Sequence, residues 1–494
     1  MRKDIGFDNQ KYVSLQSEHI KERIARFGDK LYLEMGGKLF DDYHASRVLP
    51  GFQPDSKICM LKQLSERVEI IIAICEEDIV KNKIRGDYEI TYVSDVIRLI
   101  DAFRGIGFFV GSVVITMYTG HPVADAFKTR LENMGMPVYL HYPIAGYPAN
   151  VPLIVSEDGY GKNQYIETSR PLVVVTAPGP GSGKMAVCLS QLYHENKKGI
   201  KAGYAKFETF PVWNLPLKHP VNLAYEAATA DLNDVNMIDP FHLEAYGETT
   251  VNYNRDIEVF PVLNAIFAKI LGESPYKSPT DMGVNMAGFC ITNEDVVKKA
   301  CHDEILRRYY QIMLDCRRGR VSEDAVYRVE LTMNQANITT ADRSVVTYAL
   351  EKAEATDQPA VAIEFPSGEI VTGKTSALLG ASSAAILNAL KKLAGIDENI
   401  DLISPEVIEP IQILKVNHFG NQNPRLHTDE TLLALSICAK DGGYAQLALE
   451  HLHELRGAEA HSSVILAPID VSIFKKLGVN ITCEAVYQPK KYKG

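Results

Sequence analysis

Six short β-branched runs alternate with amphipathic stretches between residues 30 and 207, and this alternation limits the possible folds more than any other feature of the chain. Near-continuous apolar strands separated by helices are typical of a parallel sheet covered by helices on both faces. We therefore predict an α/β fold whose N-terminal part is a mainly parallel sheet. The predicted strands are residues 30–35, 68–75, 111–118, 136–142, 171–177 and 200–207.

A glycine-rich stretch, PLVVVTAPGPGSGKMAVCLSQLYHE, joins the fifth predicted strand to a helical pattern. This order of strand, glycine-rich loop and helix is the context of a P-loop, in which loop amides and a lysine surround phosphate oxygens. We therefore predict a phosphate or carboxylate site, with an ordinary glycine-rich turn as the alternative. The predicted binding residues are Gly179, Gly181, Ser182, Gly183 and Lys184.

Two positions of this loop depart from the P-loop pattern. Pro178 stands where the first glycine is expected, and Met185 replaces the Ser or Thr that ligates Mg²⁺. The loop therefore favours an anion site over nucleoside-triphosphate hydrolysis. Residues 368–375 match GxxxxGK[ST] in letters, but the sequence around them predicts a hairpin, so we do not interpret them as a P-loop.

Residues 208–247 are crowded with short polar side chains among apolar neighbours. This composition fits a segment that lines a site and fits helix caps and turns equally well, so both interpretations stay open. Carboxylates suit a hard cation such as Mg²⁺. We predict Asp231, Asp234 and Asp239 as metal ligands, and Lys206, Asp231 and Asp234 as catalytic residues.

A fourth catalytic candidate is His461, which stands in a Glu–His–Ser cluster just before an apolar strand. No G-x-S-x-G elbow surrounds the serines, so a structural role stays open as the alternative. The eight cysteines form no CxxC pair, and no HExxH motif is present. The sequence therefore predicts neither a conventional zinc site nor a redox dithiol.

The charge and hydropathy patterns bear on partners and location. A net charge of −10 and a pI of about 5.8 argue against a broad nucleic-acid surface. No run approaches the roughly 18 to 20 apolar residues that span a bilayer, and the N-terminus lacks a signal peptide. We expect a cytoplasmic protein that binds a small phosphorylated ligand rather than nucleic acid or membrane, with a homo-oligomer left open.

The domain organisation is predicted in three parts. Residues 1–256 form the N-terminal α/β domain with the glycine-rich loop, and residues 257–355 form a helical middle region in which Asn293 caps a helix. From residue 356 the pattern predicts a strand, a turn, a second strand and a helix. Residues 356–494 are therefore predicted to form a second, C-terminal α/β domain.

Several long stretches resemble a family of uncharacterised bacterial proteins of about this length, known only as a domain of unknown function. They include LYLEMGGKLFDDYHASRVLPGF, KFETFPVWNLPLKHPVNLAYEAATADLNDVNMIDPFHLEAYG and YKSPTDMGVNMAG, together with the glycine-rich stretch. The resemblance implies a cytoplasmic multidomain α/β protein. It assigns no catalytic residue and no substrate.

The stretch FPSGEIVTGKTSALLGASSAAILNAL is similar to the opening hairpin and first helix of the cytidine-deaminase-like fold. The zinc ligands and the catalytic glutamate of that fold have no counterparts here, because the helix begins with LLGASSAA and no PCxxC follows. The resemblance therefore implies a topology and not a deaminase activity.

The sequence leaves two functional hypotheses open. The first is an enzyme, a transferase or hydrolase that uses a phosphate ester or nucleotide; its cofactor is left open, with Mg²⁺ as the candidate. The second is a non-catalytic anion or nucleotide sensor or assembly protein, which the missing Ser or Thr of the loop favours. Dependence on a divalent cation would distinguish the two.

Overall fold

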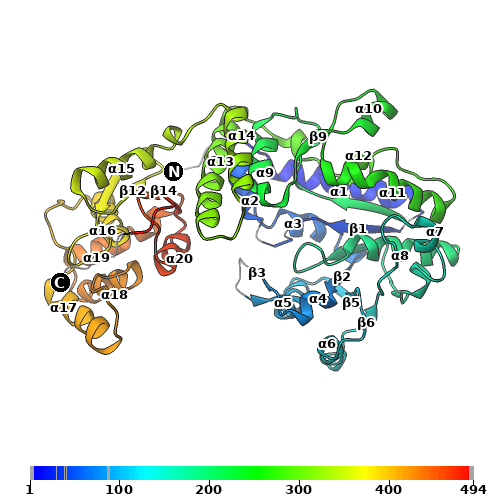
Figure 1. The fold of residues 1–494 in the computed structure, drawn as a ribbon, viewed down its shortest axis with the longest axis horizontal. Helices are drawn as coiled ribbons and strands as arrows, with labels where there is room; N and C mark the ends of the chain where they lie inside the picture. The colour runs from blue at the N-terminus through cyan, green and yellow to red at the C-terminus, as the bar shows by residue number, and fades with distance from the viewer. Residues whose placement is uncertain (1–4, 29, 38, 41, 86–89, 489–494) are drawn as a thin grey trace. The chain divides into compact units, whose positions relative to one another are not determined.

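The computed structural model describes residues 5–28, 30–37, 39–40, 42–85 and 90–488. The chain divides into two compact units (Figure 1). The N-terminal unit comprises Lys3–Glu226 and Asp234–Cys301, and the C-terminal unit is built from Ala227–Asn233 and His302–Gly494.

A seven-stranded sheet in the order β11-β8-β1-β7-β2-β5-β6 organises the N-terminal unit, and every neighbouring pair in it is parallel. The six strands predicted from the sequence are six of these seven, so the predicted parallel α/β sheet is confirmed. The short strand β11 was not predicted, because its segment has turn-like composition. The strands are β1 (Leu31–Met35), β2 (Val68–Cys75), β5 (Phe109–Thr116), β6 (Val138–Leu140), β7 (Leu172–Thr176), β8 (Gly203–Phe207) and β11 (Gly283–Val284).

Helices cover both faces of this sheet, because successive residues of a strand point to opposite sides. Ile71 of β2 belongs to a buried cluster formed with helices α8 and α11. Its neighbours Ile70 and Ile72 are buried as well, on the side where α5 contacts β2 and β5. The helices of this unit are α1 (Asn9–Arg26), α2 (Tyr43–Val48), α3 (Ser56–Lys62), α4 (Glu76–Val80), α5 (Tyr92–Gly105), α6 (Pro122–Asn133), α7 (Val151–Ile154), α8 (Lys184–Lys197), α9 (Pro220–Ala228, which ends in the C-terminal unit), α10 (Pro240–Tyr246), α11 (Asn254–Leu271) and α12 (Pro279–Met282).

Two antiparallel ribbons complete the N-terminal unit. They are β3 (Ile84–Arg85) with β4 (Ile90–Thr91), and β9 (Asn236–Ile238) with β10 (Val251–Tyr253). The second ribbon lies in the polar segment, where proline spacing predicts only short elements. Asp239 caps α10 through the amides of Phe241 and His242. The left-handed Gly247 (φ 71°) ends that helix.

A four-stranded sheet in the order β13-β12-β14-β15 organises the C-terminal unit. Strands β12 and β13 form the predicted hairpin, whose turn is closed by a bond from Gly368 N to Phe365 O (2.9 Å). Residues 370–374 therefore pair along a strand and do not form a phosphate loop. The similarity to the cytidine-deaminase-like fold stays a prediction. The strands are β12 (Ala360–Glu364), β13 (Ile370–Lys374), β14 (Glu459–Ser462) and β15 (Asn480–Cys483).

The helices of the C-terminal unit surround a core cluster drawn from residues 361–479. Helix α13 (Glu294–Arg317) crosses the boundary between the units, and its first turn is capped by Asn293 as predicted, through Oδ1 and the amide of Val296 (3.3 Å). The others are α14 (Glu323–Ala336), α15 (Ser344–Thr356), α16 (Ala381–Leu393), α17 (Pro405–Ile413), α18 (Thr428–Cys438), α19 (Gly443–Glu450) and α20 (Pro468–Lys476).

The units do not follow the three predicted parts. The boundary predicted after residue 256 falls inside α11, whose Phe260, Leu263 and Phe267 pack in the same core cluster as the large sheet. The helical region predicted at 257–355 is therefore divided, with α11 in the N-terminal unit and α14 and α15 in the C-terminal unit.

Candidate functional site

Adjacent strands β1 and β7 lead the chain away in opposite directions. From β1 the chain continues to β2, on the far side of β7, whereas from β7 it continues to β8, on the far side of β1. In open parallel sheets, ligands bind beyond the carboxyl ends of the strands at such a reversal. The fold therefore favours a ligand at the loops that follow β1 and β7, and the glycine-rich loop is one of them.

The glycine-rich loop, residues 177–183, adopts backbone angles that suit glycine. Gly181 and Gly183 have φ of 78° and 80°, and Gly183 caps the N-terminus of α8. A Cβ on Gly179 would lie 2.1 Å from Tyr92 Oη, whereas a Cβ on Gly181 would meet nothing within 4 Å. Glycine thus lets the loop pass close to Tyr92 and leaves the space beside Gly181 open.

Ser182 stabilises this loop from inside. Its side chain is buried, and its Oγ donates to Gly179 O at 2.8 Å. Its own carbonyl accepts a bond from Thr116 Oγ1 of β5 at 2.9 Å. Since the Ser182 hydroxyl is used within the loop and Met185 has no oxygen in its side chain, the loop lacks the magnesium-binding hydroxyl of a P-loop.

The loop amides and Lys184 are available to an anion. Among the residues that the structure describes, the amides of Gly181, Gly183 and Lys184 have no protein acceptor, and the Lys184 ammonium has no hydrogen bond or ion pair. The first amides of a helix and its positive dipole end favour anions. Lys184 is half-buried and brings a positive charge to the first position of α8.

Lys184 also lies near strand β1. It stands one helical turn before Cys188, whose thiol is buried under α8. Burial raises the pKa of this thiol, the Glu34 carboxylate of β1 raises it further, and Lys184 opposes both. Helix α8, which begins at Lys184, contacts both β1 and β7.

A buried polar cluster lies at the carboxyl end of β8, next to β1. Lys206 pairs in register with Glu34, and its Nζ contacts Asp256 Oδ2 at 2.6 Å, Glu208 Oε1 at 2.9 Å and Tyr253 Oη at 3.1 Å. Although burial opposes it, Glu208, Tyr253 and Asp256 hold the pKa of Lys206 well above its usual value. Lys206, predicted as catalytic, therefore keeps its proton and orients the neighbouring carboxylates. It is not available as a general base.

Glu208 is the member of this cluster that can exchange a proton near neutral pH. Burial, helped by Asp256 and opposed by Lys206, raises the pKa of Glu208 to about 7. Tyr253 Oη donates a short hydrogen bond to Glu208 Oε1. A Cβ on Gly36, the first residue after β1, would lie 2.8 Å from Glu208 Cγ. The carboxyl thus lies against the turn after β1, at the reversal.

A second buried lysine fixes that turn. Lys57 Nζ donates to Gly36 O at 3.1 Å and forms an ion pair with Asp42 at 3.0 Å. Burial alone would raise the pKa of Asp42, but the Lys57 ammonium holds it below its usual value. The Lys57–Asp42 ion pair therefore stabilises the turn after β1, against which Glu208 lies.

Glu34, Tyr253 and Asp256 were not predicted from the sequence as site residues. One signal was available, because Glu34 and Lys206 each interrupt an apolar strand, in LYLEM and GYAKF. A charge at a buried strand position needs a partner. Tyr253 and Asp256 carry no comparable signal, since only the fold brings them to β8.

The carboxylates of two predicted metal ligands contact other groups of the protein. Asp234 forms an ion pair with Arg255 at 2.7 Å. Asp239 is fully buried, caps α10 and accepts two bonds from Thr280. Within the described ranges, no group of three His, Cys, Asp or Glu side chains is arranged to hold a metal. The aspartate metal site stays a prediction.

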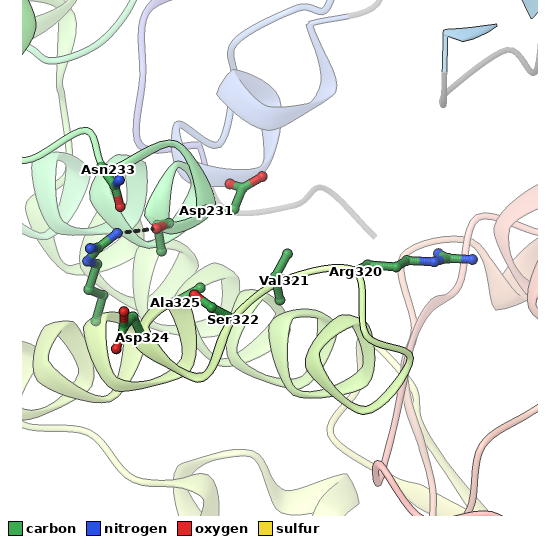
Figure 2. Close-up of a pocket in the computed structure, with 9 residues that line it drawn as sticks. Asp231, Asn233, Arg320, Val321, Ser322, Asp324 and Ala325 are labelled. Carbon is green, nitrogen blue, oxygen red and sulfur yellow. Dashed lines mark hydrogen bonds between the residues drawn. The ribbon is translucent and has the colours of Figure 1, made fainter.

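The third predicted ligand, Asp231, belongs to the C-terminal unit and lines a polar pocket of about 370 Å³ (Figure 2). Arg328 Nη1 donates to Ala230 O at 3.1 Å across this pocket. Figure 2 shows Arg320 directed away from the other labelled residues. Asp231 is exposed, so its carboxylate is solvated and lies outside any cluster of metal-ligating side chains among the described residues.

His461, the fourth predicted catalytic residue, is enclosed in the C-terminal unit. It is fully buried in β14, with Nδ1 2.9 Å from Thr482 Oγ1 and Nε2 3.2 Å from Glu484 Oε1. The ring of Tyr310 lies 4.6 Å away, centroid to centroid. Burial lowers the pKa of His461. The imidazole therefore has two protein partners and a structural environment.

The chain belongs to the family of proteins that carry the domain of unknown function DUF1846. Residues 5–337 match the model of its N-terminal domain and residues 341–492 match that of its C-terminal domain. A UPF0371 protein of Streptococcus pyogenes serotype M3 is 59% identical over 489 residues, 99% of each chain. A UPF0371 protein of Streptococcus pneumoniae (strain JJA) is 58% identical over 483 residues, 98% of each chain. The resemblance to an uncharacterised bacterial family is thus confirmed.

In the parts of the chain that the structure describes, none of the helices combines the length and the apolar character needed to cross a bilayer.

Proposed function

We propose that this chain is a cytoplasmic enzyme that binds a phosphorylated small molecule or nucleotide where β1 and β7 lead the chain in opposite directions. The amides of Gly181 and Gly183 and the Lys184 ammonium bind the phosphate. Glu208, hydrogen-bonded to Tyr253, exchanges a proton with the reacting group. The observation that carries the proposal is the position of the glycine-rich loop and of the half-buried Glu208 carboxyl with the Tyr253 phenol at the same end of one sheet.

The two halves of this site have complementary chemistry. The loop supplies positive charge without a protein partner among the described residues, as a phosphate requires. Glu208 supplies a group that is partly ionised at neutral pH, as a general acid or base requires. Lys206 and Asp256 touch neither the loop nor a ligand in this proposal, and they act by positioning Glu208 and Tyr253.

The first test is a thermal-shift series with nucleotides, phosphorylated metabolites and inorganic phosphate, each with and without Mg²⁺. A ligand at 100 times its Kd stabilises the folded chain by about 2.7 kcal/mol. Lys184→Met keeps the length of the side chain but removes its charge, so the affinity should fall about 10- to 100-fold, as for a lost charge-assisted hydrogen bond.

Lys198→Met is the matched control, because Lys198 lies exposed at the other end of the same helix. Its affinity for the same ligand should equal that of the wild type. Equal binding by wild type and Lys184→Met would contradict the phosphate assignment. With a substrate identified, Glu208→Gln should keep the affinity and lower kcat by about 100-fold or more.

The alternative is a non-catalytic anion or nucleotide sensor. The observation that favours it is the missing metal anchor, because Met185 has no oxygen and the Ser182 hydroxyl is bonded within the loop. A sensor should bind equally well with and without Mg²⁺, and Glu208→Gln should leave its only measurable activity, binding, unchanged.

A further inference from the structure

Strand β1 lies between the two halves of the proposed site. Its neighbour on one side is β7, which leads into the glycine-rich loop, and its neighbour on the other is β8, which leads to Glu208. A ligand that extends from the loop to Glu208 must therefore pass the carboxyl end of β1. Glu34, the last residue but one of this strand, is in register with Val175 of β7 and Lys206 of β8.

The Glu34 side chain lies on the same side of the sheet as the polar cluster of β8. Residues in register on parallel strands point to the same side, as do alternate residues of one strand. Glu34 therefore shares its side with Lys206 and with Tyr204, whose Oη donates to Glu34 Oε2 at 2.7 Å. Val175 on this side belongs to the core cluster that includes α8, the helix that begins at Lys184. The carboxylate is thus on the α8 side of the sheet.

In the part of the chain that the structure describes, the buried Glu34 carboxylate uses one of its two oxygens. The residue is 8% exposed, and Tyr204 is the donor to Oε2. Oε1 has no hydrogen-bond donor among the described residues, because the contacts of the Lys206 ammonium go to the other members of its cluster. A carboxylate oxygen that has left water without gaining a donor costs free energy. Oε1 therefore has the character of an atom that a ligand completes.

The chemistry of Glu34 selects the kind of group that it can bind. A carboxylate accepts hydrogen bonds and repels a phosphate, so its partner is a donor in another part of the ligand. Hydroxyl and ammonium groups are such donors. Lys206, in register with Glu34, already supplies a positive charge on this side of the sheet. A neutral hydroxyl is therefore favoured over a second ammonium.

We propose that Glu34 binds a hydroxyl group in the part of the ligand between its phosphate and its reacting end, so that the ligand is a phosphorylated sugar. The sugar can be free or can be the ribose of a nucleotide, since both present the same hydroxyls. The inference rests on the proposed phosphate site and adds the class of substrate to it.

Calorimetric titration of the full chain with ribose 5-phosphate, pentyl phosphate and inorganic phosphate tests the proposal. Pentyl phosphate has the same number of carbons as ribose 5-phosphate but no hydroxyl on them. The wild type should bind ribose 5-phosphate about 10- to 100-fold more tightly than pentyl phosphate, as for a hydrogen bond to a charged group. Glu34→Gln keeps the shape of the side chain and should reduce this preference by about 10-fold. Its affinity for inorganic phosphate should be no lower than that of the wild type.

Glu66→Gln is the matched control, because Glu66 is exposed in the turn before β2, at the other end of the sheet. It should keep the preference of the wild type, and both variants should keep its circular dichroism. Adenosine monophosphate separates the two sources of the sugar. Tighter binding of this nucleotide than of ribose 5-phosphate, lowered in Glu34→Gln, supports the contact with a nucleotide ribose, and the reverse order supports the contact with a free sugar.

Two results would overturn the proposal, and neither requires a variant to fold. The first is a wild type that binds ribose 5-phosphate and pentyl phosphate equally well. The second is a wild type that prefers 5-aminopentyl phosphate to ribose 5-phosphate, because the donor would then be an ammonium. The phosphate site fails separately, if Lys184→Met binds inorganic phosphate as tightly as the wild type does.

Discussion

The Glu208 carboxyl should make the stability of the chain depend on pH in an unusual direction. Its pKa is raised from 4.5 to about 7, chiefly by burial. Between these values the folded chain holds a proton that the unfolded chain has released, so the free energy of unfolding falls as the pH rises. Glu208→Gln should remove this fall, changing the slope by up to one proton, about 1.4 kcal/mol per pH unit.

Urea unfolding at a series of pH values between about 4.5 and 8 measures this slope. Glu244→Gln is the control, since Glu244 is exposed and its substitution should change stability by less than about 0.5 kcal/mol at every pH. Parallel stability curves for wild type and Glu208→Gln would show that the carboxyl is ionised throughout, and a role in proton transfer near neutral pH would be lost with it.

At the scale of residues, the sequence predicts the glycine-rich loop but not the polar cluster at the carboxyl end of β8. The loop has a local signal, because a strand, clustered glycines and a lysine follow one another within a few positions. Glu208, Tyr253 and Asp256 are brought together by the position of β8 beside β1, which no spacing in the sequence encodes. The same limit explains the predicted aspartates. Short polar residues look alike in sequence whether they cap a helix, as Asp239 does, or line a site.

At the scale of elements, an ionic network should hold part of the C-terminal unit together. Arg307 of α13 and Arg343, at the N-terminus of α15, both contact the Glu459 carboxylate of β14, at 2.8 Å and 2.6 Å. Asn480 of β15 donates to the same carboxylate at 2.7 Å. Glu459→Ala would leave the buried Arg343 and the largely buried Arg307 without this partner and should lower the free energy of unfolding by about 3 to 5 kcal/mol.

Equilibrium urea unfolding measures the cost, and Glu354→Ala supplies the comparison, because Glu354 is exposed on α15 and should change stability by less than about 0.5 kcal/mol. If Glu459→Ala lowers the free energy of unfolding by no more than this control, the network does not connect the helices to the sheet.

The Glu459 carboxyl should make stability depend on pH in the direction opposite to that expected for Glu208. The two arginines, opposed by burial, hold the pKa of Glu459 below its usual 4.5, so its contribution is lost as the pH falls below that value.

Strands are the elements that the sequence predicts best here, because a buried parallel strand is a near-continuous apolar run. The predicted strands at 30–35, 68–75 and 171–177 differ from β1, β2 and β7 by at most one residue at either end. Strand β11 has two residues in a turn-rich segment, so its pairing with β8 is set by the tertiary fold and not by its composition. Glu459 and His461 form a polar cluster before an apolar run in the sequence, and only the fold shows that both are enclosed by protein partners.

At the scale of the whole molecule, the sequence predicts α/β parts at both ends but not where they divide. Helices α11, α14 and α15 have similar amphipathic patterns, and a pattern does not say against which sheet a helix packs. The apolar face of α11 completes the core of the large sheet, whereas α15 contacts β12, β13 and β14 of the small one. The helical region predicted between the two parts is therefore shared by both units.

The fragment 339–494 should fold by itself, because the main core cluster of the C-terminal unit is drawn from residues 361–479 alone. Thr339 retains its capping box with Asp342, so the fragment begins at a closed turn. Calorimetry should give one cooperative transition with an enthalpy of about 100 kcal/mol, as expected for its length. The fragment lacks Arg307 and Tyr310, which contact Glu459 and His461, and should therefore be less stable than the unit in the full chain. A fragment that unfolds without a transition would show that this core depends on residues before 339, and the C-terminal unit would then have to be defined from His302, as its contacts suggest.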